Sequence, residues 1–254
     1  MIRTIIVVLF VVIMVILLIP ALLVEWVLGK FNPHAKDVSS FWIVKNLIVR
    51  PGLWLVGAHI TTYGRENIPE GQPVVFMANH RSMFDCLVMY PQYKGLCGTV
   101  SKVEVKKIPL INKWMDNLHC LYVDRDDIRN GLKMILDGIE LLKSGISVCI
   151  MPEGTRSATD EMRPFKEGSM KLATKSGCPI IPVAITGTAE LFENHKPFAR
   201  PSDVTITFGK PIEVSKLSRD QQKNLGAHVR EVVQVMLDNG PGHMVEYSDV
   251  IKPL

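Results

Sequence analysis

A run of twenty residues without a charge, Ile5 to Val24, constrains the fold of this chain more than any other feature. A hydrocarbon layer about 30 Å thick is crossed by roughly twenty apolar residues in a helix. The run is too long for the apolar part of a cleaved signal peptide, and Ile19-Pro20-Ala21 lacks the small-x-small pattern of a cleavage site. We therefore expect an uncleaved, membrane-anchoring helical segment at the N-terminus.

The charges on either side of this run predict its orientation. Arg3 alone precedes it, whereas several cations follow within the next segment. An excess of Lys and Arg marks the cytoplasmic side of a membrane segment. We therefore expect the protein at a membrane, with the bulk of the chain on the cytoplasmic face. The cations that follow are Lys30, Lys36, Lys45 and Arg50.

The segment from Phe41 to Val56 is a second candidate for contact with a membrane. It carries Trp42 and Trp54 near cations, which suits the headgroup layer, and Pro51-Gly52 interrupts it. A helix buried against a soluble domain fits the same residues, and both interpretations stay open. We assign residues 1–58 to an N-terminal membrane anchor with an interfacial helix, and residues 59–254 to an α/β domain.

Short apolar runs alternate with helical stretches from Thr61 onward. Strands that alternate with helices predict an α/β fold, with a mixed, mostly parallel sheet flanked by helices. The expected strands are Pro73–Ala78, Gly98–Ser101, Leu118–Val123, Ile146–Met151, Pro179–Ile185 and Val204–Phe208. The expected helices, apart from one that begins near Ser82, are Asp127–Lys143, Glu167–Ser176 and Lys216–Asn239.

The charge and the cysteines exclude several classes of protein. A net charge of +4 without a basic stripe among aromatic residues is not typical of a nucleic-acid protein. The five cysteines form no Cys-x-x-Cys pair, which favours free thiols in a reducing compartment. The seven histidines show no His-Glu-x-x-His or other metal-ligand spacing, so we expect no metal site.

The stretch Asn79–Asp85 directly follows the apolar run Pro73–Ala78, and it holds a histidine and a carboxylate five residues apart. A strand that ends at His80, followed by a turn that returns Asp85 to the imidazole, is one way to present a general base. The same residues also resemble a capping box, in which Asp85 only satisfies a helix N-terminus. His195 has no acidic residue five positions on, and we interpret it as a surface loop histidine.

The strand Ile146–Met151 runs into the loop Pro152–Ser157, which has the residues of an anion site. Gly154 allows backbone amides to approach a ligand, and the Arg156 guanidinium matches a phosphate in shape and charge. Glu153 could hold Arg156 in place or contact a substrate hydroxyl. An ordinary polar turn with a surface Glu–Arg pair accounts for the loop equally well.

Four polar side chains follow predicted strands, namely those of His80, Lys102, Arg125 and Arg156. A lone lysine or arginine is usually a solvated charge. However, a parallel sheet places the carboxyl ends of its strands at one edge, where ligands bind in α/β proteins. We therefore expect these four side chains to converge.

Four ordered blocks carry a resemblance to the glycerolipid acyltransferases, and among them to the 1-acyl-glycerol-3-phosphate acyltransferases of the PlsC type. The first block is Asn79-His80-x-x-x-x-Asp85 and the third is Pro152-Glu153-Gly154-Thr155-Arg156-Ser157. The second and fourth blocks are Tyr122-Val123-Asp124-Arg125 and Ile181-Pro182-Val183. The match covers roughly residues 60 to 210, and the apolar N-terminus is similar to the family's membrane-anchoring segment.

The resemblance implies an enzyme that moves an acyl group from acyl-CoA or acyl-carrier protein to the sn-2 hydroxyl of lysophosphatidate. His80 would be the general base and Asp85 its orienting partner, with no metal and no cofactor beyond the acyl donor. The partners would be lysophosphatidate, an acyl thioester and membrane lipid. The residues implied in glycerophosphate binding are Lys102, Arg125, Glu153, Gly154, Thr155 and Arg156.

Two alternatives remain open from the sequence. The acceptor could be another lysolipid, because a phosphate site does not identify the rest of the molecule. The chain could also be a non-catalytic, membrane-tethered module that binds phospholipids, which would need Arg156 but not His80. A serine hydrolase is not indicated, because no Gly-x-Ser-x-Gly occurs.

Overall fold

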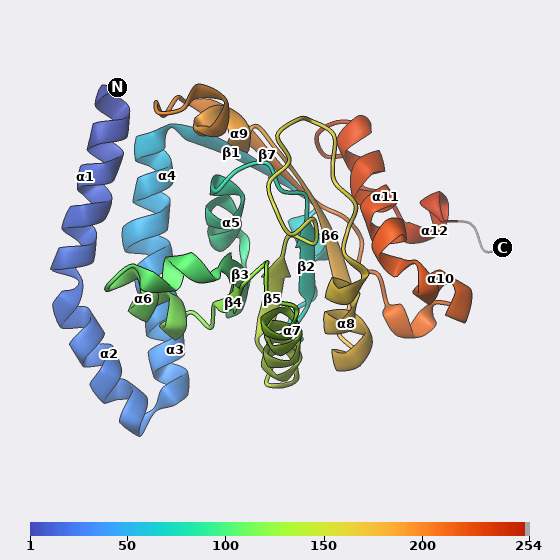
Figure 1. Ribbon diagram of the computed structural model, residues 1–254, viewed down its shortest axis with the longest axis horizontal. Coiled ribbons are helices and arrows are strands. Elements are labelled where there is room, and N and C mark those ends of the chain that lie inside the picture. Colours follow the sequence, from blue (N-terminus) through green and yellow to red (C-terminus); the bar gives the residue numbers. More distant parts are fainter. Residues whose placement is uncertain (252–254) are drawn as a thin grey trace.

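The computed structural model describes residues 1–251, and a seven-stranded sheet with helices on both faces forms its centre (Figure 1). The strand order is β1-β7-β6-β2-β5-β3-β4. Strand β7 runs antiparallel to β6 and the other neighbouring pairs are parallel, so the expected mixed, mostly parallel sheet is confirmed. The strands are β1 (Ala58–Tyr63), β2 (Val75–Ala78), β3 (Cys97–Lys102), β4 (Leu121–Val123), β5 (Ser147–Ile150), β6 (Ile180–Thr186) and β7 (Ser202–Phe208).

Strand β2 lies near the middle of the sheet and separates two hydrophobic cores. Its side chains alternate between the faces, as the two-residue period of a strand requires. Val75 and Met77 belong to one core, and Phe76 and Ala78 to the other. All four residues are buried, which is why the run reads as continuously apolar rather than alternating.

Three helices cover the face that Val75 and Met77 enter. They are α7 (Ile128–Lys143), α8 (Glu167–Ser176) and α11 (Leu225–Asp238). Helix α7 buries Ile135, Ile139 and Leu142 at helical spacing, and the Asp127 side chain caps its first turn by accepting from the Arg129 N–H at 2.8 Å. The amphipathic pattern therefore predicted this helix, but Ile128 and Leu132, which share the apolar spacing, are exposed.

The other face packs against helix α5 (Phe84–Met89) and the N-terminal helical hairpin, which we define as residues 2–56. In the hairpin, α1 and α2 lie beside the returning helices at the edge of the molecule (Figure 1). Glu25 is buried between the two arms and accepts a hydrogen bond from Ser39 Oγ at 2.9 Å. The hairpin consists of α1 (Ile2–Leu17), α2 (Ile19–Phe31), α3 (Pro33–Ile43), a π-helical segment (Val44–Val49) and α4 (Arg50–Val56).

The apolar run Ile5–Val24 forms two helices rather than the single helix that we expected. The chain bends at Leu18, because Pro20 has no N–H to donate to the carbonyl of Ile16 and its ring clashes there. Within residues 1–251, no single helix is both long and apolar enough to cross a membrane. Helices α1 and α2 pass that test only together, across a bend of 46°.

Other expectations differ from the structure in detail. The expected helix Lys216–Asn239 is divided at Asn224, whose φ of −117° and ψ of 35° are not helical. Strand β1 was not predicted, because it lies at the sheet edge with only one face covered. The remaining helices are α6 (Ile111–Asn117), α9 (Thr188–Leu191), α10 (Arg219–Lys223) and α12 (Tyr247–Val250).

Candidate active site

Five neighbouring parallel strands reach one edge of the sheet, and a polar side chain stands at the carboxyl end of each. In spatial order these are Thr188 after β6, His80 after β2, Arg156 after β5, Lys102 at the end of β3 and Arg125 after β4. The chain order differs, because β5 inserts between β2 and β3. The parallel topology thus brings together the four side chains that we expected to converge and adds Thr188.

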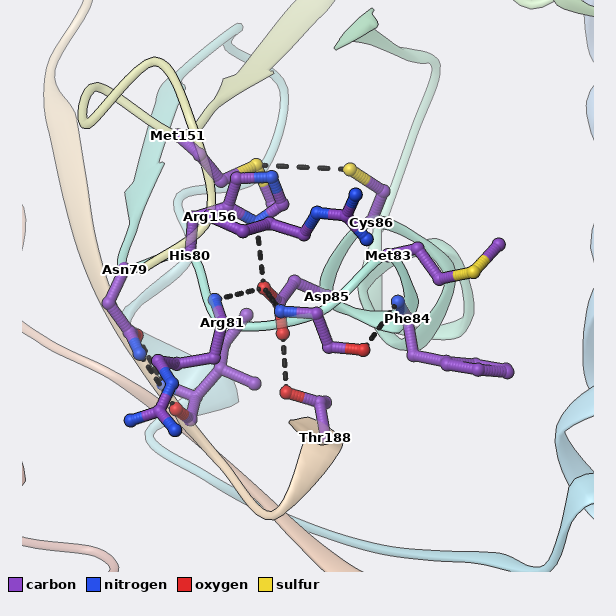
Figure 2. Close-up of polar contacts among 12 residues, drawn as sticks. Asn79, His80, Arg81, Met83, Phe84, Asp85, Cys86, Met151, Arg156 and Thr188 are labelled. Atoms are coloured by element: carbon purple, nitrogen blue, oxygen red, sulfur yellow. Dashed lines mark hydrogen bonds and ion pairs between the residues drawn. The ribbon is translucent and has the colours of Figure 1, made fainter. Parts of the chain in front are cut away.

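His80 and Asp85 form a direct contact in the loop that leads into α5 (Figure 2). The His80 Nδ1 atom lies 2.8 Å from Asp85 Oδ2, and the two side chains are 12% and 1% exposed. A carboxylate accepts, so Nδ1 carries the proton and Nε2 is left as the unprotonated nitrogen. This is the tautomer that a general base requires.

The Asp85 carboxylate also organises the backbone around the histidine. Its Oδ2 atom accepts from the N–H groups of Arg81 and Ser82, each at 2.8 Å. Helix α5 begins after Met83, which forms no side-chain cap, and the Ser82 hydroxyl accepts from the Phe84 N–H, so the capping box considered for Asp85 is not formed. The Thr188 hydroxyl donates to the other oxygen, Oδ1 (Figure 2). Asp85 is therefore the partner of the imidazole and an acceptor for loop N–H groups, and it is not part of a capping box.

Glu153 supports the backbone of His80. Its Oε1 atom accepts from the His80 N–H at 2.6 Å, and its Oε2 atom accepts from Ser157 Oγ at 2.6 Å and from the Arg163 N–H at 2.9 Å. The Ser157 N–H in turn donates to the His80 carbonyl at 2.8 Å. Glu153 is only 4% exposed, so both of its oxygens serve the protein. We expected Glu153 beside Arg156 or a substrate hydroxyl, and the structure places it under the histidine instead.

Three cations, Lys102, Arg125 and Arg156, lie at the ends of neighbouring strands at the same edge of the sheet. Burial and the nearby Arg156 guanidinium lower the pKa of Arg125, and the carboxylate of Glu104 opposes that effect. Lys102 pairs with Glu104, and Arg156 Nη1 lies 2.9 Å from Glu193 Oε1. The neighbouring positive charges of Arg125 and Arg156 make the electrostatic potential between them more positive, which favours binding of an anion there.

Comparison with known proteins agrees with this geometry. Residues 59–186 match the family model described as Acyltransferase. The chain belongs to the acyltransferase family. The matched range contains every residue that we expected in the site.

Individual relatives support the family assignment. The 1-acyl-sn-glycerol-3-phosphate acyltransferase of Borreliella burgdorferi is 30% identical over 197 residues, which cover 78% of this chain and 79% of the relative. The protein of the same name from Saccharomyces cerevisiae is 26% identical, over 77% of this chain and 65% of the relative. The crystal structure of the acyltransferase PlsC from Thermotoga maritima aligns with a TM-score of 0.78 at 24% identity, over 94% of this chain and 96% of that chain, and so shares the fold.

Glu193 and Thr188 are two residues of this acyltransferase that sequence reasoning missed. The Glu193 carboxylate accepts from the Ser82 hydroxyl, from the Met83 N–H at 2.9 Å and from Arg156. It therefore joins the loop before Asp85 to the loop after β5. Thr188 could have been found by the same signal as the others, because it is a polar residue that follows a strand. Glu193 carries no such signal, since it lies well beyond the end of β6.

The loop after β5 turns at Gly154, whose φ of +73° is costly for residues with a Cβ. A Cβ there would also meet the side chain of Lys166 at 2.8 Å. Gly154 and Thr155 are partly buried, whereas Arg156 is exposed. Gly154 and Thr155 thus shape the loop that presents Arg156.

Cys86 lies beside Asp85, with its Sγ atom 3.9 Å from Met151 Sδ (Figure 2). Burial raises the pKa of the Cys86 thiol well above its usual value. A thiol attacks an acyl group as the thiolate. Cys86 therefore stays protonated near neutral pH and is not activated as a nucleophile.

Proposed function

We propose that this chain transfers a fatty acyl group from an acyl thioester to the sn-2 hydroxyl of 1-acylglycerol-3-phosphate, which gives phosphatidate. One observation carries the proposal: a buried His–Asp pair with a free Nε2 lies beside exposed cations at a single edge of the sheet. The names of the relatives in Borreliella and yeast agree with this acceptor.

In the proposed reaction His80 Nε2 takes the proton of the acceptor hydroxyl as its oxygen attacks the thioester carbonyl. A new ester C–O bond forms, the C–S bond breaks, and the proton passes from the imidazolium to the departing thiolate. Asp85 holds the reactive tautomer and stabilises the imidazolium, as the carboxylate does in a Ser-His-Asp triad. The acceptor hydroxyl is itself the nucleophile, so no acyl-enzyme is needed and no cofactor besides the donor.

The acceptor phosphate is proposed to bind between Arg156 and Arg125, with Lys102 nearby. Arginine offers paired donors to phosphate oxygens. Glu193 and Glu104 contact these cations in the structure, so the bound phosphate takes over part of that contact. Glu153 is left out of the phosphate site, because both of its oxygens are already bound by protein groups.

We further propose that residues 1–58 attach the protein to a membrane and that residues 59–254 form the catalytic domain on the cytoplasmic face. Apolar side chains are exposed along the hairpin, which is unusual for a surface in water. The acceptor is a bilayer lipid, so attachment brings the active site to its substrate. The exposed side chains include Ile5, Leu9, Val12, Ile13, Ile16 and Leu17.

The test is acyl transfer from labelled acyl-CoA to lysophosphatidate in detergent micelles, with wild type and His80→Ala in parallel. We expect labelled phosphatidate from wild type and its loss in the variant. Acyl-carrier protein replaces acyl-CoA in a second arm, because the site does not distinguish the donors. If neither donor yields phosphatidate, a lysolipid with another headgroup is tested, and failure there would favour a non-catalytic binding module.

A second comparison tests the phosphate site. Arg156→Ala should raise the KM for lysophosphatidate with little change in the KM for the donor, by roughly tenfold or more if a charged hydrogen bond is lost. Uncharged monoacylglycerol should be a poor acceptor for wild type. Equal turnover of the two acceptors would contradict the proposed phosphate contact.

A further inference from the structure

A second group of cations lies at the opposite edge of the sheet from His80. There a cavity of about 850 Å³ opens beside the amino ends of β2, β3 and β5, where Val74, Cys97 and Ser147 line it. His80 follows the other end of β2, six residues from Val74. At about 3.3 Å per residue, the two sites are separated by roughly 20 Å.

Lys45 and Arg65 stand at the rim of this cavity and come from different parts of the fold. Lys45 belongs to the π-helical segment of the hairpin, and Arg65 follows β1. Lys45 Nζ donates to the Tyr93 carbonyl at 3.2 Å, and Arg65 Nε donates to the Gln92 carbonyl at 3.1 Å. Both cations are therefore held over the same loop by main-chain oxygens.

Neither cation has a carboxylate partner within residues 1–251, where an ion pair means an N–O distance of 4.0 Å or less. Burial lowers the pKa of Lys45, and the positive charges of Arg50 and Arg65 lower it further. Lys45 is partly buried and Arg65 is exposed at the rim, and the two neighbouring positive charges favour an anion between them. The π-helical hydrogen bond from the Arg50 N–H to the Lys45 carbonyl marks an irregularity of a kind that is frequent at functional sites.

The same rim contains a matched pair that is already neutral. Lys94 Nζ lies 3.1 Å from Glu70 Oε1 and also donates to the Ile68 carbonyl at 3.0 Å. Lys94 lines the same cavity, but its charge is satisfied. The positive character of the cavity therefore comes from Lys45 and Arg65, and Lys94 provides an internal control.

We propose that this cavity binds a phosphate group between Lys45 and Arg65, with the carbon part of the ligand against Phe76 and Tyr93. Two cations that form no ion pair within residues 1–251 match the charge of a phosphate, and arginine offers paired donors to its oxygens. Phe76 and Tyr93 are among the lining residues, which are both polar and apolar, and each is 2% exposed. The ligand class is a phosphate ester, either an anionic phospholipid headgroup or a soluble phosphate compound. Its phosphate would join the hairpin to the catalytic domain.

The test uses the full chain in detergent micelles with Arg156→Ala as the background, which weakens the phosphate site proposed beside His80. Thermal unfolding is followed with rising inorganic phosphate against chloride at equal ionic strength, because a ligand of the folded state raises Tm. We expect phosphate to raise Tm in this background. Adding Lys45→Met and Arg65→Gln should weaken the apparent Kd about tenfold or more, as loss of charged hydrogen bonds predicts. Lys94→Met should leave it unchanged.

A lipid arm separates the two sources of phosphate. The same proteins are melted in micelles doped with phosphatidylglycerol or with phosphatidylcholine. If phosphatidylglycerol raises Tm, phosphatidylcholine does not, and the rise is lost without Lys45 and Arg65, the ligand is a lipid headgroup. If inorganic phosphate raises Tm in the same way, the ligand is a soluble compound. The proposal is overturned if no phosphate compound protects, or if protection is the same with and without the two cations. If the variant with both Lys45→Met and Arg65→Gln fails to fold, the comparison is made with Lys45→Met alone. The proposal is then overturned if this substitution leaves the protection by phosphate unchanged.

Discussion

Two histidine–carboxylate pairs in this molecule have the same sequence separation and the same contact distance, but different surroundings. His80 and Asp85 lie 2.8 Å apart, and so do His195 and Glu190. Asp85 is 1% exposed, whereas the Glu190 side chain is 51% exposed. The first pair uses Nδ1 of its histidine and the second uses Nε2. A contact of 2.8 Å is therefore not what distinguishes a general base.

The difference lies in what holds each carboxylate. Asp85 accepts four hydrogen bonds, including one from Thr188, which comes from a distant part of the chain. Glu190 accepts from Asn194 and His195, both in its own local turn. No acidic residue follows His195 at the five-residue spacing, and we interpreted it as a surface loop histidine. Its acidic partner lies upstream instead, because the turn after α9 brings His195 back to Glu190.

The largest effect is expected from a substitution in the His80–Asp85 pair. His80→Ala should reduce acyl transfer by about 100- to 10,000-fold, the usual contribution of a positioned general base. His195→Ala is the matched control and should leave turnover unchanged. Steady-state rates with labelled acyl-CoA and lysophosphatidate measure both variants. Equal losses in the two variants would mean that the buried setting does not matter.

The next effect separates charge from position. Asp85→Asn keeps the size of the side chain but removes the charge that stabilises the imidazolium, so kcat should fall about a hundredfold or more. Glu190→Gln is the matched change in the exposed pair and should not alter kcat. Circular dichroism before the assay checks that both variants are folded. Near-normal turnover of Asp85→Asn would mean that Asp85 serves only to hold the backbone N–H groups of this loop.

A smaller effect concerns Thr188. Thr188→Val keeps the volume but removes one hydrogen bond to Asp85, which should lower kcat about tenfold if that bond to a charged group is lost. The acceptor KM should not change, because Thr188 positions Asp85 and does not contact the phosphate cations. Thr188→Ser should restore kcat. If Thr188→Ser loses as much kcat as Thr188→Val, the hydroxyl alone does not account for the effect of Thr188, and its methyl group contributes as well.

The smallest effect concerns the exposed pair and pH. Hydrogen bonds from Asn194 and His195 lower the pKa of Glu190 below its usual value. The contribution of this pair to stability is therefore present above the ordinary glutamate range and is lost as pH falls through the lowered pKa. Glu190→Gln should change the free energy of unfolding by less than about 0.5 kcal/mol, as for other surface pairs. Urea unfolding of wild type and variant across the acidic range measures it.

Periodicity in the sequence predicted most of the sheet and the helices that cover one of its faces. The buried runs at β2, β5 and β6 and the amphipathic α7 were placed correctly, because burial on one or both faces imposes a pattern on the residues themselves. Strand β1, in which no residue is fully buried, and the division at Asn224 left no such pattern. An edge strand and a break between helices depend on neighbours that are distant in the chain.

The sequence by itself determined which residues could do chemistry. Strand ends marked His80 and Arg156, and the five-residue spacing marked Asp85, because these signals are local. Only the tertiary structure decided the roles of Glu153, Glu193 and their neighbours. Asn79, for example, exchanges two hydrogen bonds with the backbone of Ile185, 106 residues away. The physical reason is that hydrogen bonds form between groups that are close in the fold. The strand order that brings distant groups together depends on the whole chain, and no single segment of the sequence determines it.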